Sequence, residues 1–124
     1  MATPGTVIGW TLDAEQRSGL LGQYPPRYEK IVAHHVTLAT DATRRPLPAP
    51  VRAAIVGRAD DDQGVEAMVV TIDGDTSRPD GSTFHITWSL GNGRRARESN
   101  DVLKERGWTE FDHPIPIALT PARM

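Results

Sequence analysis

Short apolar runs separated by polar turns make up most of the chain, and two of these runs share one interruption. The run at 33–38 reads Ala-His-His-Val-Thr-Leu, and the run at 84–88 reads Phe-His-Ile-Thr-Trp. Their β-branched and aromatic residues favour extended structure, so both runs are predicted to be strands. Side chains two positions apart in a strand point to the same face. Each histidine therefore shares a face with its threonine, while the residue between them points into the core.

The rest of the pattern predicts further strands, polar turns and two short helices. Asp13, with Gln16 three residues later, forms a capping-box pattern that predicts a helix of roughly three turns. Ser99 is the predicted N-cap of a second helix, and Gly107 is its predicted C-terminal stop. The prolines of the last extended segment place that segment at a sheet edge or partly outside the sheet. The predicted strands span residues 6–12, 31–39, 51–59, 65–73 and 84–90, and the last extended segment spans 108–119.

This order of elements predicts an α+β fold with mostly antiparallel strands and both helices on the outside. A chain of 124 residues suits a single domain over 1–124. The net charge of −2 provides no global basic field that would draw the protein to nucleic acid or to acidic membranes. No cysteine is present, which excludes a disulfide framework and thiolate chemistry. Residues 1–9 contain no signal-peptide pattern and no apolar run could span a bilayer, so we expect a cytoplasmic protein without a membrane partner.

The two histidine–threonine pairs suggest acid/base chemistry at a phosphate. One imidazole can accept a proton from water while the other donates a proton to a leaving oxygen, both near neutral pH. Threonine hydroxyls beside them can donate hydrogen bonds to phosphate oxygens. A metal site is poorly supported, because His34 and His35 are adjacent strand residues that face opposite sides. His34 is instead expected to pack with Val36 and Leu38 or to cap a polar network.

The tetrads His35-Val36-Thr37-Leu38 and His85-Ile86-Thr87-Trp88 resemble the paired signature of the two-histidine (2H) phosphoesterases. The run from Tyr24-Pro25-Pro26 to Leu38 is most similar to the cyclic phosphodiesterase domain of fungal-type tRNA ligases and its small stand-alone relatives, as are Ser99-Asn100 to Leu103 and Gly107-Trp108.

The resemblance implies a bilobal fold whose motif strands face each other across a cleft. It implies metal-independent hydrolysis of 2′,3′-cyclic phosphates at RNA ends or on nucleotides, with no cofactor. By the resemblance, His35 and His85 are the acid/base pair, and Thr37 and Thr87 hold the phosphate. Which histidine is the base stays open, as does whether a 2′- or a 3′-phosphate is formed.

Other interpretations stay open beside this one. Tyr28, Arg78 and Arg94 are candidate substrate contacts, although a solvated charge run is the commoner explanation for arginines after the second motif. The substrate could be another phosphodiester, such as a cyclic oligonucleotide signal or a 2′-5′ linkage. A non-catalytic nucleotide- or RNA-binding module would keep the same residues without turnover. A third possibility is that the repeat is accidental and that this is a structural α+β domain. No protein partner can be inferred.

Overall fold

Ten elements build two antiparallel sheets and two helices in the computed structural model, which describes residues 5–124. In chain order they are β1 (Ile8–Leu12), α1 (Ala14–Gln23), β2 (Lys30–Ile31), β3 (His35–Ala39), β4 (Ala53–Asp60), β5 (Val65–Ile72), β6 (His85–Leu90), α2 (Glu98–Arg106), β7 (Thr109–Ile117) and β8 (Leu119–Arg123). The predicted α+β class with antiparallel strands is confirmed. The first four positions of the segment in which we expect no signal peptide lie outside the described residues.

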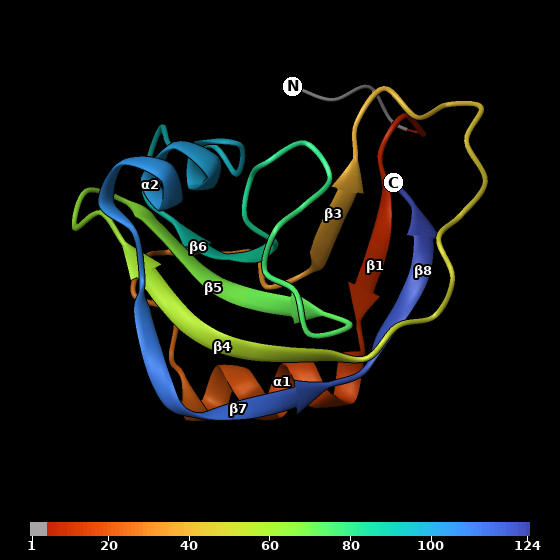
Figure 1. The fold of residues 1–124 in the computed structure, drawn as a ribbon. Helices are drawn as coiled ribbons and strands as arrows, with labels where there is room; N and C mark the ends of the chain where they lie inside the picture. The colour runs from red at the N-terminus through yellow and green to blue at the C-terminus, as the bar shows by residue number, and fades with distance from the viewer. Residues whose placement is uncertain (1–4) are drawn as a thin grey trace.

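The strands form a three-stranded sheet, ordered β3-β1-β8, and a five-stranded sheet, ordered β2-β6-β5-β4-β7. Figure 1 shows α1 below the larger sheet and α2 above it, with the smaller sheet standing at one end. The main core joins α1 to both sheets and includes Trp10, Val36, Met68, Ile86 and Trp88. A second cluster lies under α2 and includes Val65, Val69, Leu90, Val102 and Leu103. Each face of the larger sheet thus packs against its own cluster of buried apolar side chains.

The first helix begins as its sequence predicts, and the second does not. The Asp13 carboxylate accepts the backbone N–H of Gln16 at 2.9 Å, which confirms the N-cap of α1. The prediction that Ser99 caps α2 is wrong, because the helix begins at Glu98 and Ser99 is buried inside its first turn. Gly107 does end α2, where its φ of 70° suits a residue without a Cβ.

The predicted continuous strand at 31–39 is wrong, because the chain changes sheets inside it. β2 belongs to the larger sheet and β3 to the smaller one, and Ala33 between them has a φ of 43°. The extended segment predicted at 108–119 corresponds to β7, and the chain enters β8 only at its last residue. β7 does lie at a sheet edge, as its prolines predict, whereas β8 pairs with β1 and has no counterpart in the predicted elements.

Candidate functional site

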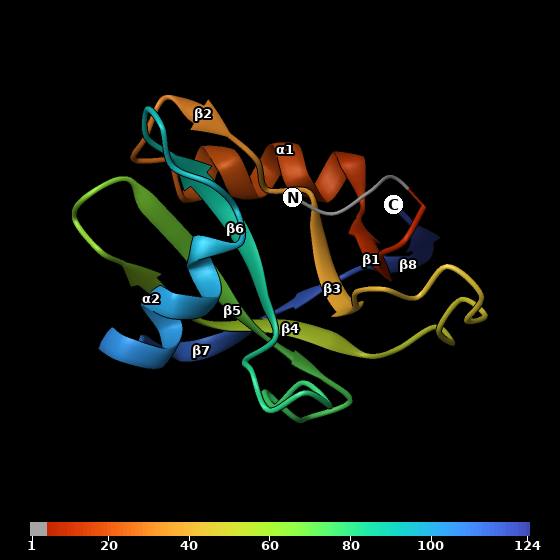
Figure 2. The ribbon, with the colours of Figure 1, turned by 90° about the horizontal axis from the view of Figure 1, so that it is seen from above.

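The two motif strands are neighbours although they belong to different sheets. The backbone N–H of Ala33 donates to the Thr87 carbonyl, and the N–H of Val32 donates to the Trp88 carbonyl, each at 2.9 Å. β3 then diverges from β6 and joins the smaller sheet (Figure 2). The residue between each histidine and its threonine points into the core as predicted, since Val36 and Ile86 are fully buried there. In β6 both faces are covered, so every residue after His85 is buried. The alternate positions carry His35 and His85, and a positive charge on His85 lowers the pKa of His35.

His35 lies at the start of β3 and is half-buried. Burial, with the neighbouring His34 and His85, lowers its pKa from 6.5 to about 4. The His34 and His35 Nδ1 atoms are 3.1 Å apart, and their rings meet edge to face. His34 precedes β3, turns back to its neighbour and is exposed. The expectations that His34 and His35 face opposite sides of one strand and that His34 packs with Val36 and Leu38 are therefore wrong. His35 is thus a neutral imidazole at neutral pH and can accept a proton.

His85 is oriented by the backbone of its own strand. Its Nδ1 lies 2.8 Å from the Thr83 carbonyl, which can only accept, so Nδ1 carries the proton and Nε2 is left for chemistry. Burial lowers the pKa of His85, the hydrogen bond to Thr83 raises it, and the positive charge of Arg78 lowers it, with a net lowering. Both imidazoles are therefore neutral at pH 7 in the free protein, and the Thr83 carbonyl favours the protonated form of His85.

Arg78 is a buried cation in the loop that connects β5 to β6. Its side chain is 9% exposed, and its Nε and Nη2 donate to Asp80 at 3.1 and 2.6 Å. This pairing holds the pKa of the Asp80 carboxyl well below its usual range. Within residues 5–124, no protein atom accepts a hydrogen bond from Nη1. Arg78 therefore brings one free donor and a positive charge within electrostatic range of His85.

The two threonines of the motifs have different surroundings. The Thr87 hydroxyl is buried, donates to the Ala96 carbonyl at 3.3 Å and lies 2.9 Å from the Ser99 hydroxyl at the start of α2. The Thr37 hydroxyl is half-buried and has no hydrogen-bond partner in the described part of the chain. Only Thr37 therefore has a hydroxyl proton that the protein does not already use.

The other two candidate contacts lie away from the histidines, around the turn between β4 and β5. The Tyr28 hydroxyl donates to Asp60 at 2.6 Å, and burial raises its pKa. Arg94 pairs with Asp61 at 2.9 Å and with Glu98 at 3.1 Å. The structure therefore gathers His35, His85, Thr37, Thr87 and Arg78 around the motif strands and leaves Tyr28 and Arg94 outside that group.

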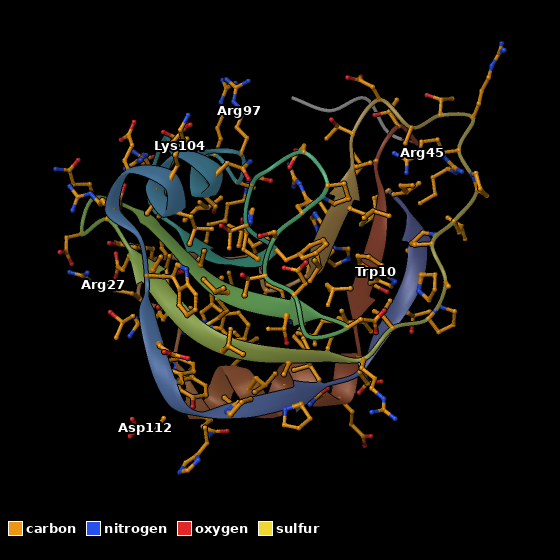
Figure 3. The ribbon with its side chains drawn as sticks, in the orientation of Figure 1. Trp10, Arg27, Arg45, Arg97, Lys104 and Asp112 are labelled. Carbon is orange, nitrogen blue, oxygen red and sulfur yellow. The ribbon has the colours of Figure 1, made fainter. Side chains whose placement is uncertain are left out.

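Two groups that shape the site carry no sequence signal. The Thr83 carbonyl is a backbone atom, and Ser99 reads as an ordinary helix cap. Two shallow depressions border α2 and are lined by residues such as Arg95, Arg97 and Glu105, but neither is lined by a histidine. Arg97, which directly precedes α2, and Lys104 on α2 project into solvent (Figure 3). They are cations of the surface, separate from the histidine pair.

Comparisons with protein-family models, with curated proteins and with solved structures gave no match. Among residues 5–124, no helix is long and apolar enough to cross a membrane. The same residues contain no cluster of three or more His, Cys, Asp or Glu side chains that could hold a metal ion.

Proposed function

We propose that this protein hydrolyses 2′,3′-cyclic phosphates, at RNA ends or on nucleotides, by two-histidine acid/base catalysis without a metal. One observation carries the proposal. The two His-x-Thr segments are far apart in sequence, yet backbone hydrogen bonds from Val32 to Trp88 and from Ala33 to Thr87 tie the approach to the first motif directly to the second motif strand. A chance repeat would have no reason to place both motifs on neighbouring strands. A two-lobed arrangement with a cleft between the motif strands, and a cytoplasmic location, are part of the same proposal.

The reaction divides between the two imidazoles. A neutral imidazole takes a proton from water, and the water oxygen attacks phosphorus. The bond from phosphorus to one ribose oxygen breaks, and that oxygen takes a proton from the other imidazolium. His35 suits the base, since its pKa of about 4 keeps it neutral. His85 suits the acid, because the Thr83 carbonyl stabilises its protonated form and fixes Nε2 as the donor.

The negative charge of the substrate helps to protonate the histidine that acts as the acid. The negative charge of a bound cyclic phosphate raises the pKa of a neighbouring imidazole, which favours protonation of His85 on binding. The Thr37 hydroxyl and Arg78 Nη1 are the groups best able to donate to the phosphate oxygens. Thr87 would have to release the Ala96 carbonyl before it could donate to the same phosphate.

A non-catalytic nucleotide- or RNA-binding module is the second candidate, and one observation favours it. Both imidazoles have lowered pKa values, so the free protein holds no ready proton donor at neutral pH. Such a module would bind the cyclic phosphate through Thr37 and Arg78 without turnover.

The deciding experiment is hydrolysis of nucleoside 2′,3′-cyclic monophosphates, and of an RNA oligonucleotide with a 2′,3′-cyclic end, in the presence of EDTA. The wild type is compared with His35→Ala and His85→Ala, and the product isomer is identified by phosphorus NMR. His113→Ala is the matched control, because His113 is exposed on β7. Turnover that is lost in the first two variants and kept in the control supports the proposal. Binding of these compounds without turnover by the wild type favours the module, and neither binding nor turnover refutes both.

A further inference from the structure

The crossover at Val32, Ala33 and His34 decides where His35 lies. Val32 and Ala33 still donate their backbone N–H groups to β6, whereas the His34 carbonyl already accepts the N–H of Leu12 from β1, at 2.9 Å. The chain thus leaves one sheet and joins the other within a single residue. Ala33 is fully buried at that point, and its φ of 43° is a conformation that costs an L-residue about 1–2 kcal/mol. Something outside the crossover must hold it in this shape.

Arg17 on α1 provides that support. Its Nε donates to the Ala33 carbonyl at 2.9 Å, and its Nη2 donates to the Val32 carbonyl at 3.1 Å. These are the two carbonyls that neither sheet uses. A planar guanidinium can satisfy both at once, because its donors are fixed in a fork. Without it, two partly buried carbonyls would lose their partners and the strained residue would be free to relax.

We propose that Arg17 is a positioning residue for the histidine pair, whose guanidinium holds the crossover at Ala33 and so sets the separation of His35 from His85. β3 begins two residues after Ala33, so any rotation at the crossover swings His35 relative to β6. Only the expected effect of Arg17 on turnover rests on the proposed function. The placement of the imidazoles can be measured without any substrate.

The test compares Arg17→Met, which keeps the apolar stem, with Arg17→Lys and with a matched control on the same helix. The control is Gln16→Met. Gln16 also bridges two backbone groups, the Pro116 carbonyl at 2.7 Å and the Ala118 N–H at 2.6 Å, but these lie in β7 and the connection to β8. Both substitutions remove a side chain that ties α1 to two backbone groups, and only one of them touches the crossover.

The first readout is an NMR titration of the imidazoles in the free protein. His34 and His85 face His35, and Arg78 acts on His85, so these groups are followed together. In Arg17→Met, the pKa of His35 should rise from about 4 toward 6.5 as His35 becomes less buried and moves from His85. Gln16→Met should leave the pKa of His35 unchanged.

The second readout is turnover. Arg17→Met should lower kcat by about 10- to 100-fold with little change in KM, since misplacement of a catalytic group mainly lowers kcat.

An unchanged His35 titration in Arg17→Met would overturn the proposal, and so would an equal shift in Gln16→Met, which would indicate general loosening. Should Arg17→Met fail to fold, Arg17→Lys carries the test. Its ammonium cannot reproduce the fork, so a smaller shift in the same direction is expected, and no shift counts against the role. A wild type without turnover refutes the proposed function alone, while the titration still decides the positioning role.

Discussion

Substituting Gly9 by alanine should push the first motif strand out of place. Gly9 lies on β1 opposite Thr37 of β3, where the two backbones approach closely. A Cβ at this position would lie 2.0 Å from the Val36 carbonyl oxygen and 3.1 Å from the Leu38 nitrogen. The nearest atoms all belong to the backbone, so no side chain can rotate away to make room. β3 itself has to move.

The size of the effect follows from that distance. Bringing the Cβ to 3.0 Å from the Val36 oxygen, the closest approach that real Cβ atoms tolerate, moves β3 by about 1 Å. Overpacking of this kind typically costs about 1–3 kcal/mol, and loss of one ladder hydrogen bond adds about 1 kcal/mol. We therefore expect Gly9→Ala to lower the free energy of unfolding by about 2–4 kcal/mol. A domain with typical stability would remain folded at 25 °C.

Urea denaturation followed by tryptophan fluorescence measures this loss, because Trp10 and Trp88 are only 2% and 0% exposed in the fold. The matched control is Gly19→Ala inside α1, where a Cβ meets nothing within 4 Å. It should stabilise the protein by about 0.5–1 kcal/mol and leave turnover unchanged. Gly9→Ala should also lower kcat/KM by about 100-fold, since a shift of about 1 Å misplaces His35. A Gly9→Ala protein as stable and as active as the wild type would refute the reasoning.

Three further outcomes follow from the site. With His35 as base and His85 as acid, kcat/KM should peak between pH 4 and 6.5 and fall as pH rises through the pKa of His85; a maximum at alkaline pH would contradict the assignment. Folding lowers the pKa of His35, so between pH 6.5 and pH 4 the unfolded chain binds more protons than the folded protein. The free energy of unfolding should therefore decrease as pH falls from 6.5 to 4. His35→Gln should make this decrease smaller, as measured by urea denaturation at several pH values. Thr37→Val should lower kcat/KM about tenfold at nearly unchanged stability. Thr87→Val should lower the free energy of unfolding by about 1–2 kcal/mol, because Ser99 and the Ala96 carbonyl lose their partner. Equal effects of both substitutions on the free energy of unfolding would contradict the difference in their surroundings.

The features that could be predicted from the sequence are those set by neighbouring residues. The Asp13–Gln16 cap needs only residues three positions apart, and Gly107 ends a helix through its own conformational freedom. Alternation along β3 and β6 likewise follows from the pleat, so the burial of Val36 and Ile86 could be foreseen. Each of these features depends on a period or a spacing that is visible in the chain itself.

The features that could not be predicted depend on partners distant in sequence. The prediction for Ser99 failed because its hydroxyl lies against Thr87 from β6, a contact that no local pattern announces. The prediction of one continuous strand at 31–39 failed for the same reason, because the change of sheets depends on distant partners. An alanine in an apolar run predicts extended structure, and only the hydrogen bonds from Arg17 and to Thr87 explain a positive φ at Ala33. β8 lies beyond the end of the predicted segment, and its Pro121 is accommodated because β8 is an edge strand, where a missing N–H is tolerated.

This difference between local and long-range features explains why the sequence indicates the candidate site residues but not their geometry. The proposed chemistry needs imidazoles and hydroxyls, which are side chains that a sequence displays, and their repetition at one phase makes them visible. Their properties are set largely by backbone atoms: the Thr83 carbonyl orients His85, and the Ala33 carbonyl bonded to Arg17 holds the approach to His35. Every residue carries a carbonyl, so these contacts leave no trace in composition or spacing. Substitutions that move the backbone, such as Gly9→Ala and Arg17→Met, therefore test the site as directly as substitutions of the histidines themselves.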